Sequence, residues 1–247
     1  MSYLEPDHDF DAGKMWLEKA IAQGNIEAEN QMAWSYEFGM NVEKDESRAR
    51  ELYYRAAEQG SPLAQLALAA MYGFKDDPSD HDKEEMVKWA QIAANNGSFF
   101  ADEFLGDLYA RRGLVKRDYA RAATWYERAA RLGQPDSQQK LGQMYEQGQG
   151  VKKDLVAAYA LYKAVSLAPR FTIVYMPGQA PADMDADRKR LVRRLSKLQL
   201  AKGDALASTW KVGMDIPIRS CDGGEEPKLT REQQIEARGV DSPRRKP

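Results

Sequence analysis

Glycines return about every 36 residues along the first part of the chain, and this spacing constrains the fold more than any other feature. Each glycine closes an alanine-rich segment. A small residue follows four positions later, and a tyrosine follows twelve positions later. A fixed period of this length indicates stacked supersecondary units instead of one globular core. The repeating glycines are Gly24, Gly60, Gly97 and Gly133.

The first half of each unit predicts a helix. In the third unit the pattern is Ala101, Leu105, Gly106 and Tyr109, which are offsets 0, 4, 5 and 8 from the small residue. These offsets fall on one face of a helix with 3.6 residues per turn. We expect the residue at offset 5 to allow close approach of a neighbouring helix, and the tyrosine to bury its ring.

A turn and a second helix complete each unit. Glycines that can adopt positive φ end the first helix, and Asp45, Asp118 and Asp154 are predicted to cap the second. In the second unit the turn is longer and charged, from Gly73 through Asp82, which predicts a surface insertion. The expected fold is therefore all-α.

The detailed pattern resembles the Sel1-like repeat family, a relative of the tetratricopeptide repeats. The segments 125–133 and 141–154 carry the resemblance, with the letters WYERAARLG and LGQMYEQGQGVKKD. It covers roughly residues 9–168. The resemblance implies a right-handed α-solenoid of antiparallel helix pairs.

The ends of the chain complete the predicted organisation. The first segment fits only the second-helix template, so it is either an N-terminal cap or the remainder of a repeat whose upstream part has been removed. Near the other end we expect one long helix that caps the last repeat, followed by an extended tail. The predicted divisions are a cap helix (1–24), repeats (25–60, 61–97, 98–133 and 134–168), a loop (169–182), a capping helix (183–212) and a tail (213–247).

Composition restricts the function classes. The single cysteine, Cys221, excludes internal disulfides, and no apolar run has the length of a membrane span. The compartment stays open: periplasmic if a signal peptide has been removed, cytoplasmic otherwise. Residues 1–108 hold 22 acidic and 9 basic side chains, and residues 109–247 hold 16 and 27. This asymmetry could steer a charged partner, or it could reflect drift in solvated faces.

Catalytic and metal-binding patterns are weak. His8 and His81 lie in polar segments without a second ligand at metal spacing, and Cys221 has no catalytic signature beside it. Glu103 and Asp107 are four residues apart on one helix face, where a solvated pair is favoured over an acid–base pair. We therefore predict no enzyme, no cofactor and no metal.

The basic stretch 188–197 has two interpretations. It could contact nucleic acid or anionic lipid. No aromatic residue is interleaved with it and acidic residues precede it, which favours a solvated face of the capping helix. Nucleic acid is accordingly not among the predicted partners.

A partner is expected on the concave face, which the family resemblance assigns to the first helix of each repeat. Offsets 2, 6 and 9 lie opposite the packing face, and Trp34 and Leu66 are large apolar residues at these positions. They are either binding anchors or, for Trp34, part of a contact with the N-terminal helix around Trp16. The acidic members favour a partner with a basic surface. The candidate residues are Asn30, Trp34, Glu37, Leu66, Glu103, Asp107, Gln143 and Glu146.

The predicted function is a non-enzymatic scaffold that binds another protein. A sharper hypothesis is a stoichiometric inhibitor, such as an immunity protein for a bacterial toxin or secreted enzyme. The alternatives are an adaptor that docks at a membrane through residues 188–197, and a cell-wall or β-lactam hydrolase. The oligomeric state is left open.

Overall fold

The computed structural model describes residues 7–167 and 184–209, and this part of the chain consists of eleven α-helices without a strand. The all-α prediction is confirmed. None of these helices is long and apolar enough to cross a membrane. The chain divides into two compact units, and the boundary between them along the sequence falls within α6, between Ala101 and Asp102.

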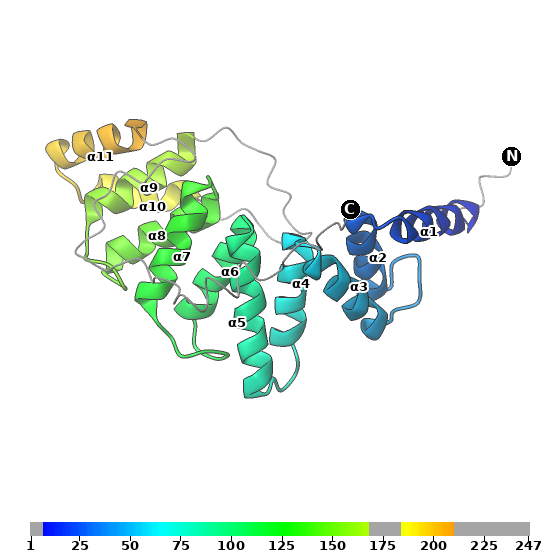
Figure 1. Cartoon of the computed structure of the whole chain (residues 1–247). Coiled ribbons are helices and arrows are strands. Elements are labelled where there is room, and N and C mark those ends of the chain that lie inside the picture. The colour runs from blue at the N-terminus through cyan, green and yellow to red at the C-terminus, as the bar shows by residue number, and fades with distance from the viewer. Residues whose placement is uncertain (1–6, 168–183, 210–247) are drawn as a thin grey trace, which may run out of the picture. The chain divides into compact units, whose positions relative to one another are not determined.

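The first unit stacks helices that are neighbours along the chain. α1 contacts α2, α2 contacts α3, α3 contacts α4, and α4 contacts α5. Figure 1 shows α2 and α3, and then α4 and α5, as antiparallel pairs. The helices are α1 (Asp7–Ala22), α2 (Ile26–Phe38), α3 (Glu46–Glu58), α4 (Pro62–Gly73) and α5 (Asp80–Asn95).

The second unit continues the same alternation of first and second repeat helices. α8 packs between α7 and α9, and α9 also contacts α10 and α11 (Figure 1). The helices are α6 (Phe99–Ala110), α7 (Tyr119–Arg131), α8 (Pro135–Gln147), α9 (Leu155–Leu167), α10 (Met184–Val192) and α11 (Lys197–Thr209).

The predicted helix caps are present. The Asp45 side chain accepts hydrogen bonds from the backbone of Ser47 and Arg48, and Asp118 accepts one from Arg121. Asp154 accepts bonds in the same way at the start of α9. These carboxylates satisfy backbone N–H groups that a helix start leaves unpaired, so the sequence fixes where each second helix begins.

The insertion in the second repeat shortens to a compact turn. α5 begins at Asp80, earlier than the predicted boundary, because Ser79 caps it. The Ser79 hydroxyl accepts from the Asp82 backbone N–H, while the Asp82 carboxylate accepts from the Ser79 N–H at 3.0 Å. This reciprocal pair is a capping box, and Asp82 also pairs with Lys75.

The core relies on small residues at helix crossings. A Cβ atom built on Gly106 would lie 2.5 Å from the ring of Tyr126, and one on Gly142 would lie 2.5 Å from the ring of Tyr162. Both glycines occupy offset 5, where the sequence predicts close approach. The tyrosine rings fill the space that a larger residue would need, and they are buried.

The prediction of a single capping helix is wrong. α10 ends at Val192 and α11 begins at Lys197, because Ser196 and Gln199 form a reciprocal backbone–side-chain pair that starts a new helix. Leu191 and Leu195 are buried near this break.

α10 and α11 cover α9, whose apolar side chains are buried nearly all round. Gly203 of α11 lies against the ring of Tyr159 as Gly106 does against Tyr126. The predicted loop at 169–182 and tail at 213–247 lie outside the described residues, and so does Cys221.

Candidate protein-binding surface

Two aromatic side chains lie on the solvent-exposed face of α2. Trp34 is 45% exposed and Phe38 is 58% exposed, and their ring centroids are 5.4 Å apart. One helical turn separates them, so they form a single apolar patch. Among the described residues, the ring that contacts Trp34 is that of Phe38 and not that of Trp16. Trp16 is 66% exposed, and the Nζ of Lys19 lies 5.0 Å from its ring centroid.

Two further candidate binding residues, Leu66 and Asn30, are less accessible to a partner than Trp34. Leu66 on α4 is half-buried. Asn30 is only 4% exposed, and its Nδ2 donates to the Ser61 hydroxyl at 2.9 Å. Since Ser61 caps the next repeat's first helix, Asn30 joins two repeats. Asn30 therefore does not present its side chain to a partner, and this part of the predicted surface is corrected.

Glu37 lies between the two aromatic residues along α2. It is half-buried, and its Oε2 accepts from the hydroxyl of Tyr53 at 2.9 Å. Burial and the Glu37 carboxylate raise the pKa of Tyr53, so this tyrosine stays a neutral donor. The Glu37 carboxylate therefore lies at the edge of the patch and accepts from a tyrosine hydroxyl.

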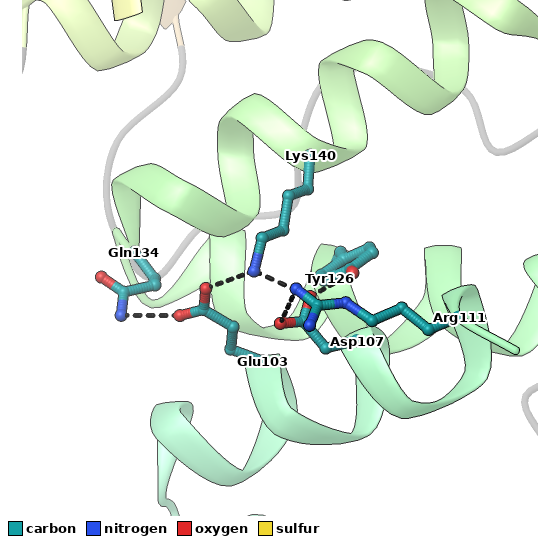
Figure 2. Close-up of polar contacts among 6 residues, drawn as sticks. All are labelled: Glu103, Asp107, Arg111, Tyr126, Gln134 and Lys140. Atoms are coloured by element: carbon teal, nitrogen blue, oxygen red, sulfur yellow. Dashed lines mark hydrogen bonds and ion pairs between the residues drawn. The ribbon is translucent and has the colours of Figure 1, made fainter. Parts of the chain in front are cut away.

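Glu103 and Asp107 belong to a closed polar network in the second unit (Figure 2). Lys140 of α8 reaches between them, with its Nζ 2.7 Å from Glu103 and 2.8 Å from Asp107. Gln134 donates to Glu103 at 3.1 Å, and Tyr126 donates to Asp107 at 2.6 Å.

This network is structural. Burial by itself would lower the pKa of Lys140, but the hydrogen bonds and charges of both carboxylates hold its pKa above the ordinary value. Burial also raises the pKa of Tyr126. Lys140 pairs with both carboxylates and Arg111 pairs with Asp107 at 3.3 Å, so Glu103 and Asp107 are neither the solvated pair that the sequence favours nor a free acid–base pair.

The last two candidates are covered by the chain itself. Gln143 donates to Asp187 of α10 at 3.3 Å. Glu146 is largely buried, and its oxygens lie 2.5 Å from Arg190 and 2.7 Å from Arg194. The basic side chains that the sequence assigns to solvent thus bind the acidic face that it assigns to a partner.

A buried polar position recurs that the sequence analysis missed. It directly follows the small residue of each repeat, and every member is at most 2% exposed. Two members are acids paired with arginines of the second helix, and two are glutamines that donate to backbone carbonyls of the preceding repeat. An acid or amide at offset 1 in all four repeats was the available signal. The four residues are Glu29, Gln65, Asp102 and Gln138.

Asp102 is the least satisfied of these groups. Its Oδ1 lies 3.3 Å from the Nε of Arg128 but accepts no hydrogen bond. Burial raises the pKa of Asp102 to about 6, and the Arg128 charge offsets only part of that shift. The folded protein therefore binds a proton here more tightly than the unfolded chain does.

We expect Asp102→Asn to remove a pH-dependent destabilisation. Because the folded pKa is raised, stability linked to Asp102 is full below about pH 4 and is lost as the pH rises through about 6. The Asn variant should match wild type near pH 4 and exceed it by roughly 2 kcal/mol at pH 7.5. Urea unfolding at both pH values checks this. An Asn variant that is less stable at pH 7.5 would show that the Asp102–Arg128 pair is net stabilising.

No metal site is found among residues 7–167 and 184–209, where no three His, Cys, Asp or Glu side chains are grouped to hold an ion. His81, a weak candidate for an ion ligand in the sequence, is exposed in the first turn of α5.

Comparison with known proteins now adds the family. The model of the Sel1 repeat matches five segments that together cover more than half of the chain. The chain belongs to the Sel1 repeat family. Proteins of this family are generally protein–protein interaction scaffolds and are typically non-enzymatic. The matched segments are 3–25, 26–61, 62–98, 101–134 and 135–164.

Two solved structures share the fold of this Sel1 repeat chain. One is c5321, described as a protective antigen of uropathogenic Escherichia coli with an SLR fold. It has a TM-score of 0.64 and 26% identity over 93% of this chain and 44% of its own. The other is a Sel1 repeat protein from Oxalobacter formigenes, with a TM-score of 0.55 and 33% identity over 65% of this chain and 67% of its own. The antiparallel helix pairs thus form an α-solenoid of the SLR type.

Two curated relatives match about half of this Sel1 repeat chain. The chitin synthase regulator SKT5 of Saccharomyces cerevisiae is 31% identical over 125 residues, which are 50% of this chain and 18% of SKT5. The uncharacterised protein NMB1327 of Neisseria meningitidis is 31% identical over 119 residues, which are 46% of this chain and 23% of that protein. The matched repeats are thus less than a quarter of either relative.

Proposed function

We propose that this Sel1 repeat chain is a non-enzymatic scaffold that binds a partner protein on the exposed face of its first repeat helices, with Trp34 as the main anchor. The observation that carries the proposal is the exposed Trp34–Phe38 pair on α2. Exposed aromatic side chains beside polar ones are typical of binding hot spots. Leu66, half-buried on α4, is a secondary anchor.

The sharper form of the proposal is a stoichiometric inhibitor, such as an immunity protein for a bacterial toxin or secreted enzyme. A preorganised helical surface suits this role, because a rigid surface loses little entropy on binding. Its signature is a tight one-to-one complex with an enzyme that loses activity in the complex.

The two rival functions have less support. A membrane adaptor would need the basic face of α10, but Arg190 and Arg194 are engaged by Glu146. A hydrolase would need an available carboxylate pair, but Lys140 holds Glu103 and Asp107.

Affinity capture from the native organism tests the proposal. Full-length wild type is compared with Trp34→Ala, and with Leu198→Ala as a control, since Leu198 is also exposed but lies on α11. We expect one stoichiometric partner that is retained by Leu198→Ala and lost by Trp34→Ala. A partner that Trp34→Ala retains in full would contradict the assigned face.

A further inference from the structure

In the fourth repeat, another part of the chain binds α8, which is the first helix of that repeat. α10 packs on α9, and side chains of α10 and of the turn after it reach α8 at offsets 2, 6 and 9. In the first repeat, α2 carries Trp34 at offset 6 and Glu37 at offset 9. Asp187 of α10 accepts from Gln139 at 3.0 Å and from Gln143 at 3.3 Å. Arg190 and Arg194 then donate to the two oxygens of Glu146. Side chains of the chain itself thus occupy these positions of α8.

α10 and the turn that follows it have an amphipathic pattern. Arg190 and Arg194 are four residues apart, and so are Leu191 and Leu195. The leucines are buried, while the arginines stay about half exposed as they reach Glu146. The bound element therefore combines an apolar pair with a guanidinium pair, each one helical turn apart.

Glu37 is the counterpart of Glu146 in the first repeat. Both acids stand nine residues after the small residue that starts the pattern, and both accept from a tyrosine sixteen residues further on. Within the described residues, Tyr53 is the only hydrogen-bond donor to Glu37. Lys44 interacts electrostatically with Glu37, but its ion pair is with Glu46 at 2.8 Å.

The aromatic residues beside Glu37 suit a basic amphipathic helix better than the glutamines at the same positions of α8. Trp34 and Phe38 occupy the offsets at which α8 carries Gln143 and Gln147. An indole face attracts a guanidinium group, and the aromatic pair offers apolar area to leucine-type side chains. A carboxylate with one donor beside an exposed aromatic pair therefore matches a basic amphipathic helix in both charge and polarity.

We propose that the α2 face formed by Trp34, Glu37 and Phe38 binds a basic amphipathic helix of the partner protein, with an arginine–glutamate pair of the kind that joins Arg190 and Arg194 to Glu146 of α8. An arginine of that helix pairs with Glu37 and stacks on Trp34, and its apolar side chains cover Phe38. The inference rests on the proposed scaffold function and specifies the class of partner.

A synthetic peptide with the sequence of residues 184–196 is the probe. A fluorescent label on the peptide reports binding to the full-length protein by anisotropy. We expect saturable binding that weakens about tenfold in Trp34→Ala and in Glu37→Gln. The glutamine retains an oxygen for Tyr53, so the fold is maintained. Leu198→Ala should bind like wild type, and a peptide of the same composition in scrambled order should bind at least tenfold more weakly.

A second comparison separates this face from α8. The peptide in which both arginines 190 and 194 are replaced with glutamine should lose about tenfold affinity for wild type and little for Glu37→Gln, because the charge pair is then already absent. Binding that depends on Glu146 and not on Glu37 would mean that the peptide only displaces α10, and would overturn the inference. If Trp34→Ala loses its native partner in the capture experiment while no peptide binds, the scaffold function stands and the helical class of partner is rejected.

Discussion

Gly150→Ala is expected to destabilise the protein by about 3 kcal/mol or more. Gly150 has φ of +69°, and a Cβ atom there would lie 2.1 Å from the carbonyl oxygen of Tyr119. The turn between α8 and α9 therefore lies directly on the backbone at the start of α7. Backbone cannot move aside as a side chain can, so the overlap adds to the cost of a left-handed conformation. Urea unfolding followed by circular dichroism measures the loss.

Two controls separate backbone strain from close approach. Gly148 also has positive φ, but its nearest contact for an added Cβ is Lys153 at 3.2 Å, so Gly148→Ala should cost only about 1 kcal/mol. The first repeat has Asn41 with φ of 61° at the position equivalent to Gly150. Gly150→Asn should therefore tolerate the conformation yet remain strongly destabilising. Equal losses at 148 and 150 would show that the contact with Tyr119 is unimportant.

The second large effect is expected at Arg55. Its Nη2 lies 2.5 Å from Glu29, whose side chain is 1% exposed, and Gln59 donates to the other oxygen at 2.7 Å. Arg55→Met leaves a buried carboxylate with one neutral donor. Removing one partner of a buried ion pair is costly, and the half-exposed arginine places the loss near the lower end, about 2–3 kcal/mol. Thermal unfolding at neutral pH measures it.

The other repeats indicate which second substitution should restore the stability lost in Arg55→Met. Gln65 and Gln138 occupy the position of Glu29 in the second and fourth repeats, where they donate to backbone carbonyls. Glu29→Gln combined with Arg55→Met should therefore recover most of the stability. Arg48 also lies on α3, where it makes an exposed pair with the N-cap Asp45 and an exposed hydrogen bond to Tyr36. Arg48→Met should therefore change stability by no more than about 0.5 kcal/mol. A double variant as unstable as Arg55→Met alone would contradict this account of the buried charge.

The repeat architecture could be predicted because local chemistry encodes it. Asp118 and Asp154 cap helices through bonds to residues two or three positions away, and Gly148 ends α8 with the positive φ expected of glycine. The helix break before Lys197 was missed, although Ser196 and Gln199 carry a cap signal. The sequence predicts one continuous helix there, because acidic residues precede basic ones in the order that the helix dipole favours.

The candidate site could be predicted only in part, because the accessibility of a polar side chain depends on distant residues. Asn30 is bound by Ser61, which is 31 residues away, and Glu146 by Arg190, which is 44 residues away. Periodicity places such residues on a face but does not reveal what covers that face. Trp34 differs because its ring contacts Phe38 of its own helix and remains exposed in the structure.

A partner protein is expected to contact the α2 face. A photo-crosslinking amino acid at position 34 tests this contact in native cells, and the same amino acid at position 74, in the insertion of the second repeat, is the comparison. Both sites are exposed and both belong to the first unit. We expect one dominant crosslinked protein at position 34 and none at position 74. A crosslink at position 74 without one at position 34 would contradict this expectation and would place the partner on the insertion.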